Sequence, residues 1–235
     1  MVKSGAALLL AAHGSSSQPE GAITVLRHAE TIRNRNLFAE VHAAFLRQPP
    51  ELDKSLNQIK ASEIYVVPLF ASPGHMARTA VPRALGPDDR VRYCDALGTH
   101  ASIPRIIGGQ IERASEQAHL KAAETDVVLV GHGTDRDPAS ENQTRHVAAR
   151  LNELGVAAKV HALFLEIEPL VDNWTDHVRG EHVIVVPFLI GSGHHALEDL
   201  PKRLGAPGRR VIQCPPVGDE PEIAESIIGL VEDFD

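Results

Sequence analysis

The sequence predicts two consecutive α/β domains of similar structure, each built on a parallel β-sheet covered by helices. Two observations support this prediction. The sequence repeats itself at a fixed shift, because the pairs His13/His132 (132 − 13 = 119) and His75/His194 (194 − 75 = 119) are both 119 residues apart. Short apolar runs such as ALLLAA and DVVLVG also alternate with longer amphipathic segments, as in a parallel sheet with helices on both faces. We therefore expect domains over 1–118 and 119–235, related by a pseudo-two-fold axis.

The repeat also covers the segments between the paired histidines. VHAAFL at 41–46 matches VHALFL at 160–165, and YVVPLF at 65–70 matches IVVPFL at 184–189. A repeat of this length means that both halves adopt the same order of elements.

Each half is predicted to alternate strand and helix throughout. Strands are expected where near-continuous apolar runs indicate burial on both faces: at 6–12, 40–46, 63–70 and 90–94, then at 125–131, 158–165, 181–190 and 209–214. Helices are expected between them, at 19–37, 50–60, 78–86 and 102–122, then at 138–154, 168–179, 196–204 and 220–232. Pro19 and Pro138 match each other in the repeat and suit the first turn of a helix.

The repeated histidines fall where such a fold binds ligands. His13 and His132 follow the first strand of each half, and His75 and His194 follow the third strand, before a short helix. Open parallel sheets bind ligands at the carboxyl ends of their strands. A histidine after a strand can also be an ordinary loop residue, but four of them on one repeat favour a functional site.

The second half contains the richer set of chemical groups. His132, Glu166 and His194 all fall at strand carboxyl ends, and imidazole with carboxylate suits a first-row divalent metal ion. The same groups accept protons near neutral pH. The position equivalent to Glu166 in the first half is Arg47, so we place the reactive centre in the second half. Glu166 could instead cap the following helix.

The motifs of the chain resemble those of the sirohydrochlorin chelatases, the two-domain class II chelatases of cobalamin and sirohaem biosynthesis. The resemblance lies in HGTDRDP (132–138), FLE (164–166), VVPFLIGSGHH (185–195) and EDLP (198–201), with a weaker first copy in HGSSSQP (13–19) and VVPLFASPGH (66–75). It covers nearly the whole chain. It implies flavodoxin-like domains and ATP-independent insertion of Fe(II) or Co(II) into sirohydrochlorin, with the metal as substrate and no permanently bound cofactor.

The resemblance also implies a histidine pair and a carboxylate at the site. Carried over to this sequence, these are His132, His194 and Glu166. The internal repeat adds His13 and His75 as further candidate metal-binding positions. The usual GGHV motif of the family is GSGHHA here, and counting back from Pro201 selects His195. The internal repeat selects His194, which we favour.

Sirohydrochlorin carries several carboxylates, which an acidic protein must meet with hydroxyls, selected cations and helix N-termini. The candidates for these contacts share a predicted place at the rim of the site, although each could equally be an ordinary surface residue: Ser15, Ser16, Ser72, Arg78, Thr134, Arg136 and Ser192.

Composition restricts the remaining functions. A net charge of −8 argues against a nucleic-acid partner, and Cys94 and Cys214 are expected to be buried thiols. The apolar run in GAALLLAAHGS is too short for a membrane span and lacks a signal-peptide layout. We therefore expect a cytoplasmic enzyme. Since the second copy lies in the same chain, we also expect a monomer.

Two alternatives remain open at this point. LRHAETIRN at 26–34 resembles the RHGE-type signature of the histidine phosphatases, but Ala29 replaces the glycine and His28 is predicted to lie within a helix. The other alternative is a non-catalytic carrier of tetrapyrrole or metal.

Overall fold

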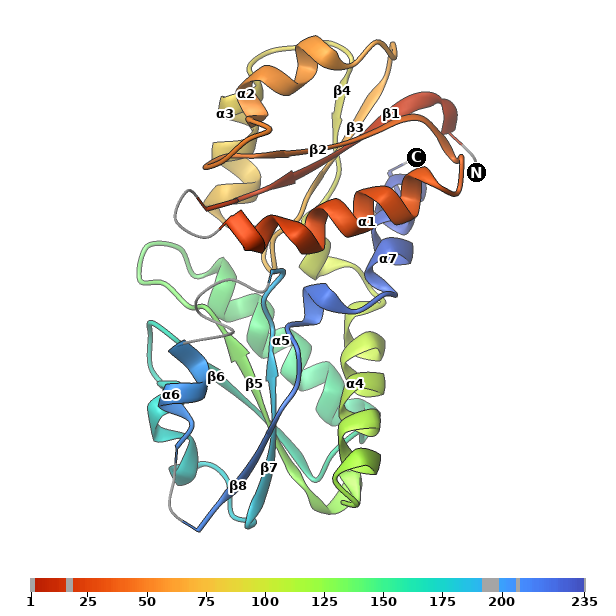
Figure 1. Cartoon of the computed structure of the whole chain (residues 1–235). Helices are drawn as coiled ribbons and strands as arrows, with labels where there is room; N and C mark the ends of the chain where they lie inside the picture. The colour runs from red at the N-terminus through yellow and green to blue at the C-terminus, as the bar shows by residue number, and fades with distance from the viewer. Residues whose placement is uncertain (1–2, 16–18, 192–198, 206–207, 235) are drawn as a thin grey trace. The chain divides into compact units, whose positions relative to one another are not determined.

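The computed structural model contains two compact units, each with its own parallel sheet (Figure 1). It describes all residues except 1–2, 16–18, 192–198, 206–207 and 235. One unit comprises Met1–His100 with Pro221–Asp235, and the other comprises Ala101–Glu220. The predicted fold class, two tandem parallel-sheet α/β domains, is therefore confirmed.

The first unit has a four-stranded sheet in the order β2-β1-β3-β4, and every neighbouring pair is parallel. Its strands are β1 (Lys3–Ala12), β2 (Phe38–Phe45), β3 (Ile64–Pro68) and β4 (Val91–Tyr93). Its helices are η1 (Pro19–Ala22), α1 (Ile23–Arg33), α2 (Leu52–Ser55), η2 (Leu56–Gln58), the π-helical η3 (Met76–Ala80), α3 (Val81–Leu85), η4 (Leu97–Thr99) and α7 (Ile223–Glu232).

The second unit repeats this topology, with a sheet in the order β6-β5-β7-β8. Its strands are β5 (Asp126–Gly131), β6 (Lys159–Phe164), β7 (His182–Pro187) and β8 (Arg210–Gln213). Its helices are α4 (Ile103–Gln117), η5 (Ala122–Glu124), α5 (Ala139–Leu154), η6 (Val171–Asp176), α6 (Leu200–Arg203) and η8 (Val217–Asp219).

The central strands form the core of each sheet. Residues 7–11 of β1 and 127–130 of β5 are completely buried, as expected for strands that helices cover on both faces. Cys94 and Cys214 are buried and unpaired, and burial raises the pKa of each thiol to about 12.

The strand registers show where the repeat is exact and where it changes. Leu9 pairs with Val66, and Val128 pairs with Val185, at the shift of 119. In the last strands Ile64 pairs with Val91, whereas Val183 pairs with Val211, which is a shift of 120 for the second partner.

The additional residue of the second copy can be placed from the helices. Val81 and Leu85, the first and last residues of α3, are buried. The residues 119 positions later, Leu200 in α6 and Leu204 directly after it, are also buried. Since the shift is still 119 at Leu204 and is 120 at Val211, the additional residue lies between these two positions.

The last helix of each sequence copy belongs to the unit of the other copy. Helix α4 packs on α5 and β7, and α7 packs on α1, β3 and η4. Packing therefore divides the chain at 100/101 and 220/221. The boundary at 118/119 stays our prediction of where the two sequence copies meet.

Some helices are shorter than predicted. The helix expected at 19–37 is a 3₁₀ turn followed by α1, which ends at Arg33. The turn that follows α1 contains Asn36 in a left-handed conformation with φ of 54°. The segment expected as a helix at 168–179 contains only the 3₁₀ helix η6.

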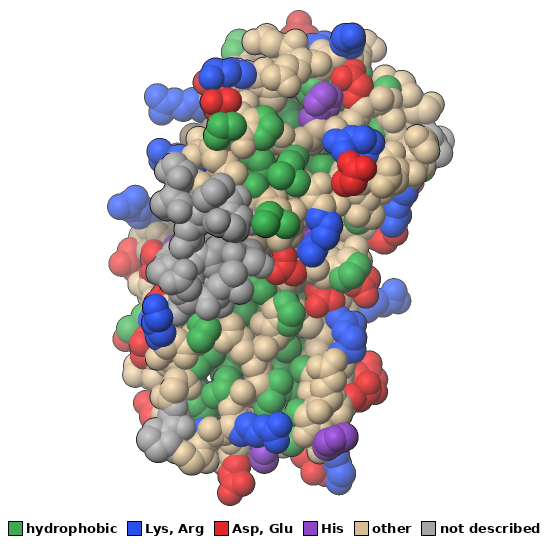
Figure 2. Space-filling model, viewed as in Figure 1, with side chains coloured by type: hydrophobic (Ala, Val, Ile, Leu, Met, Phe, Trp, Pro, Cys, Tyr) green, Lys and Arg blue, Asp and Glu red, His purple; other side chains and the backbone are tan. Residues whose placement is uncertain are grey.

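The surface agrees with the mixed composition of the chain. Lys and Arg side chains lie among Asp and Glu side chains over the face seen in Figure 2. Within the described part of the chain, no helix is long and apolar enough to cross a bilayer.

Candidate functional site

His132 lies directly after β5, in a turn that requires glycine at the next position. Gly133 has φ of +72°, and a Cβ atom there would be 2.6 Å from Cγ1 of Ile167 and 3.1 Å from Cβ of Phe164. A side chain would therefore be strained by the backbone conformation and would collide with the end of the neighbouring strand. Gly133 allows the turn after β5 to approach the residues that follow β6.

Glu166 reaches the same place from the neighbouring strand. Strands β5 and β6 are paired up to Gly131 and Phe164. Beyond them, the backbone N–H groups of Leu165 and Glu166 donate to the carbonyl oxygen of His132 at 3.1 and 3.0 Å. The two candidate residues are thus held together by backbone hydrogen bonds at the carboxyl ends of adjacent strands.

The side chains of His132 and Glu166 also approach each other. His132 Nδ1 lies 2.8 Å from the carbonyl oxygen of Gly133, so Nδ1 carries the proton and donates it. His132 Nε2 lies 3.6 Å from Glu166 Oε1, and the two side chains are 42% and 50% exposed. Two ligands about 2.1 Å from one tetrahedral ion are about 3.4 Å apart. The pair is therefore spaced to share a cation that arrives from solvent.

The loop after His132 is ordered by its own polar groups. Thr134 Oγ1 accepts a hydrogen bond from the N–H of Arg136 at 3.3 Å, and Asp137 Oδ1 accepts from the N–H of Ala139 at 2.9 Å, at the start of α5. Arg136 is exposed, so its side chain can meet an anionic ligand. Ser140, which the sequence analysis did not select, accepts the N–H of Gly133 at 3.2 Å.

The first copy has the same backbone without the carboxylate. His13 follows β1, its Nδ1 lies 2.7 Å from the carbonyl oxygen of Gly14, and Gly14 has φ of +67°. The N–H of Arg47 donates to the carbonyl oxygen of His13 at 2.9 Å, as the N–H of Glu166 does to His132. The sequence difference between Arg47 and Glu166 thus occurs at structurally equivalent positions.

The other candidates of the first copy lie in or next to the loops after its strands. His75 precedes η3 and is exposed, Arg78 lies within η3 and is also exposed, and Ser72 is half-buried. The N–H of Ser15 donates to Gln48 Oε1 at 2.6 Å.

Four of the selected residues lie outside the described part of the chain: Ser16, Ser192, His194 and His195. The rest of the chain, apart from these and the other undescribed positions, contains no group of three or more side chains suited to hold a metal ion.

The phosphatase alternative is not supported by the position of its histidine. His28 lies in the middle of α1 and is only 1% exposed. A phosphoryl acceptor must be accessible to its substrate, and a buried residue within a helix is not.

An arginine that the sequence analysis did not select contacts the backbone beside Glu166. Arg203 Nη1 donates to the carbonyl oxygen of Leu165 at 2.9 Å, and its guanidinium also binds the carboxylate of Asp172. In the sequence, this residue is distinguished only by a difference between the two copies, because the position equivalent to Arg203 in the first copy is Ala84.

The structure thus combines two parallel-sheet units with a histidine and a carboxylate at the strand ends of one of them. Comparison with known proteins shows the family to which this arrangement belongs. The family model described as CbiX matches residues 7–114 and 126–233. The chain belongs to the CbiX family of chelatases.

Individual relatives extend this result. A probable sirohydrochlorin cobaltochelatase of Halobacterium salinarum is 32% identical over 223 residues, which cover 83% of this chain and 75% of the relative. The structure of CbiX, the terminal enzyme for biosynthesis of siroheme in denitrifying bacteria, matches with a TM-score of 0.78 and 26% identity over 96% of this chain and 98% of its own. A multi-domain Deinococcus radiodurans protein with structural similarity to chelatases matches with a TM-score of 0.80 and 26% identity over 96% of this chain. This chain covers 54% of that protein, about half its length.

Proposed function

We propose that this protein inserts a divalent metal ion, Fe(II) or Co(II), into sirohydrochlorin without ATP. The observation that carries the proposal is the pair His132 Nε2 and Glu166 Oε1, 3.6 Å apart and exposed at the strand ends. The relatives support both metals, since the Halobacterium protein is named for cobalt and the CbiX structure for siroheme.

The chemistry requires a metal site that is not too strong. Insertion must deliver a divalent ion that has lost water and must remove two protons from pyrrole nitrogens. His132 and Glu166 can hold the ion through Nε2 and a carboxylate oxygen, and the same atoms can accept protons when the ion leaves them. A site of two or three exposed ligands can release its metal, which a closed four-ligand site would retain.

We propose His194 as the third ligand in preference to His195. The shift of 119 persists at Leu200 and Leu204, which match the buried Val81 and Leu85 of the first copy. The additional residue of the second copy lies beyond Leu204, so the repeat still pairs His194 with His75. His194→Ala should therefore reduce metal insertion more strongly than His195→Ala.

The carboxylates of the substrate require donors near the metal site. Arg136 and Thr134 follow His132 in the same loop, and Ser15 is the first-unit equivalent of Thr134. In the first unit, Ser72 lies in the loop after β3 and Arg78 lies in η3. We propose that these residues, with Ser192, contact the carboxylates. Arg136→Gln should raise the KM for sirohydrochlorin with a smaller effect on kcat.

The test is anaerobic incubation with sirohydrochlorin and either Fe(II) or Co(II), followed by absorbance. A rate above the spontaneous rate in the absence of nucleotide supports the proposal, and the ratio of the two rates identifies the preferred metal. Binding of sirohydrochlorin without acceleration would instead indicate a carrier. Turnover of phosphate esters that His28→Ala abolishes would indicate a phosphatase.

We also propose that the protein acts as a monomer, because one chain supplies both copies of the unit. Light scattering at the concentrations of the assay measures its mass directly. A mass of twice the 25.4 kDa of the chain would contradict the proposal.

A further inference from the structure

The peptide group between Leu165 and Glu166 is held at both of its polar ends. Its N–H donates to the carbonyl oxygen of His132 at 3.0 Å, and its carbonyl oxygen accepts from Arg203 Nη1 at 2.9 Å. This peptide group leads directly into Cα of Glu166. The two hydrogen bonds together restrict the backbone rotation that would move the Glu166 carboxylate relative to the His132 ring.

Arg203 is itself held in a defined orientation. Its Nε lies 3.1 and 3.0 Å from the two carboxylate oxygens of Asp172, and its Nη2 donates to the same carboxylate. Asp199 Oδ2 lies 3.8 Å from Nη1, and the Arg203 side chain is 18% exposed. Hydrogen bonds from Arg203 hold the pKa of Asp172 below its usual range. Lysine cannot reproduce this planar set of donors.

The arrangement is specific to the copy that contains Glu166. The first copy keeps the N–H of Arg47 on the carbonyl oxygen of His13. The position equivalent to Arg203 is Ala84, although Asp53 occupies the position equivalent to Asp172. Arg203 and Glu166 therefore occur together in one copy, whereas Ala84 and Arg47 occupy the equivalent positions of the other.

We propose that Arg203 is a positioning residue for Glu166, which acts on the reaction only through the orientation of that carboxylate. The inference rests on the proposed role of Glu166 in metal insertion. In the described interactions Arg203 contacts neither His132 nor the Glu166 side chain. It acts instead on the backbone that precedes Glu166, through its hydrogen bond to the carbonyl oxygen of Leu165.

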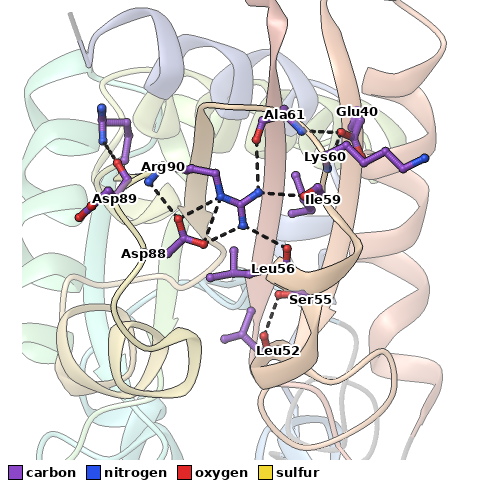
Figure 3. Close-up of polar contacts among 11 residues, drawn as sticks. Glu40, Leu52, Ser55, Leu56, Ile59, Lys60, Ala61, Asp88, Asp89 and Arg90 are labelled. Atoms are coloured by element: carbon purple, nitrogen blue, oxygen red, sulfur yellow. Dashed lines mark hydrogen bonds and ion pairs between the residues drawn. The ribbon is translucent and has the colours of Figure 1, made fainter.

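A matched control exists in the first unit, where Arg90 makes a similar set of bonds. Figure 3 shows its guanidinium between the carboxylate of Asp88 and the backbone carbonyl groups of Leu56, Ile59 and Ala61. Nε lies 3.0 Å from Asp88 Oδ1, and Nη1 lies 2.9 Å from the Ile59 carbonyl oxygen. Arg90 directly precedes β4. It therefore lies at the amino ends of the strands, whereas the candidate histidines lie at the carboxyl ends. Arg90→Lys thus measures how much stability is lost when such an arginine is replaced far from the candidate site.

The experiment compares cobalt insertion by Arg203→Lys, Glu166→Gln and the double variant, each with a thermal melt. We expect Arg203→Lys to lower kcat/KM for Co(II) by about tenfold, the usual scale for a residue that orients a metal ligand. In the Glu166→Gln background the same change should have less than about a twofold effect, because the carboxylate that Arg203 orients is already lost. Arg90→Lys should lower the melting temperature to a similar extent and leave kcat/KM within about twofold.

Equal losses from Arg203→Lys with and without the Glu166 carboxylate would overturn the inference, because they would show an effect independent of Glu166. If Arg203→Lys does not fold, Asp172→Asn replaces it, because this change removes the carboxylate charge that orients the Arg203 guanidinium and Asp172 is the more exposed of the two residues. Asp172→Asn is then compared with and without Glu166→Gln in the same way. A Glu166→Gln variant with normal activity would instead contradict the proposed function.

Discussion

His132 and His13 have nearly the same backbone setting but different neighbours. Each ring places Nδ1 on the next carbonyl oxygen. Among the described residues, His132 has a carboxylate 3.6 Å from Nε2, that of Glu166, whereas the residue equivalent to Glu166 beside His13 is Arg47. We expect His132→Ala to lower the rate of metal insertion by at least about tenfold, the usual scale for loss of a metal ligand or general base. His13→Ala should have a smaller effect, mainly on the KM for sirohydrochlorin. Steady-state kinetics with each substrate varied measures both, and the opposite ranking would place the reactive centre in the first unit.

His161 is a half-buried histidine that we expect to make stability depend on pH. Its Nε2 has no hydrogen-bond partner in the described chain and lies 3.9 Å from Asp126 Oδ1, with Lys159 and the His177 ring also nearby. Burial, together with the positive charge of Lys159, lowers its pKa below 6.5, against the effect of Asp126.

The sign of the effect follows from this lowered pKa. Because the folded state binds the proton more weakly than the unfolded state, neutral His161 stabilises the fold above about pH 6.5, and this contribution is lost as the pH falls through the lower folded pKa. We expect the free energy of unfolding to decrease less between pH 7 and 5 in His161→Gln than in the original protein. Urea unfolding at several pH values measures this difference, and parallel pH profiles would contradict it.

At the scale of elements, the turn after β5 depends on Gly133. Alanine at this position would combine a positive φ with a Cβ atom 2.6 Å from Ile167 Cγ1. Gly155→Ala is the matched control, since Gly155 ends α5 with φ of +66° and has open space where the Cβ would lie. We expect Gly133→Ala to lose about 1–3 kcal/mol more stability than Gly155→Ala, the range for overpacking. Urea unfolding decides between this result and equal losses, which would indicate backbone strain alone.

The strands could be predicted because strands buried on both faces consist of consecutive apolar residues, as in DVVLVG for β5. The segment at 168–179 could not, because Val171, Trp174 and Val178 have the i, i+3, i+7 spacing of an α-helix, whereas the structure forms only the 3₁₀ helix η6, which ends at Asp176 before Val178. The pair His132 and Glu166 could be predicted from strand ends and the repeat. Arg203 could not, since its role depends on a hydrogen bond to a carbonyl group 38 residues earlier in the chain.

At the scale of the whole molecule, the packing of the final helices predicts which fragments fold. The segment 101–220 keeps α4 with α5 and β7, whereas 119–235 loses α4 and retains α7 without the elements on which it packs. We expect 101–220 to be a folded protein with a cooperative thermal transition, and 119–235 to be unfolded or aggregated. Circular dichroism and size-exclusion chromatography of the two fragments test this, and a stable, monomeric 119–235 would contradict it.

The exchanged positions of α4 and α7 also bear on how such a chain could have arisen. In this chain the final helix of each copy packs on the unit of the other copy. We infer that two molecules of a single copy would exchange their final helices in the same way, so that folding would depend on protein concentration. Fusion of two genes makes this trade intramolecular. It also releases the copies from identity, because a symmetric pair made from one gene must carry the same residue twice. In this chain the two copies carry different residues at the equivalent position, Glu166 in one and Arg47 in the other.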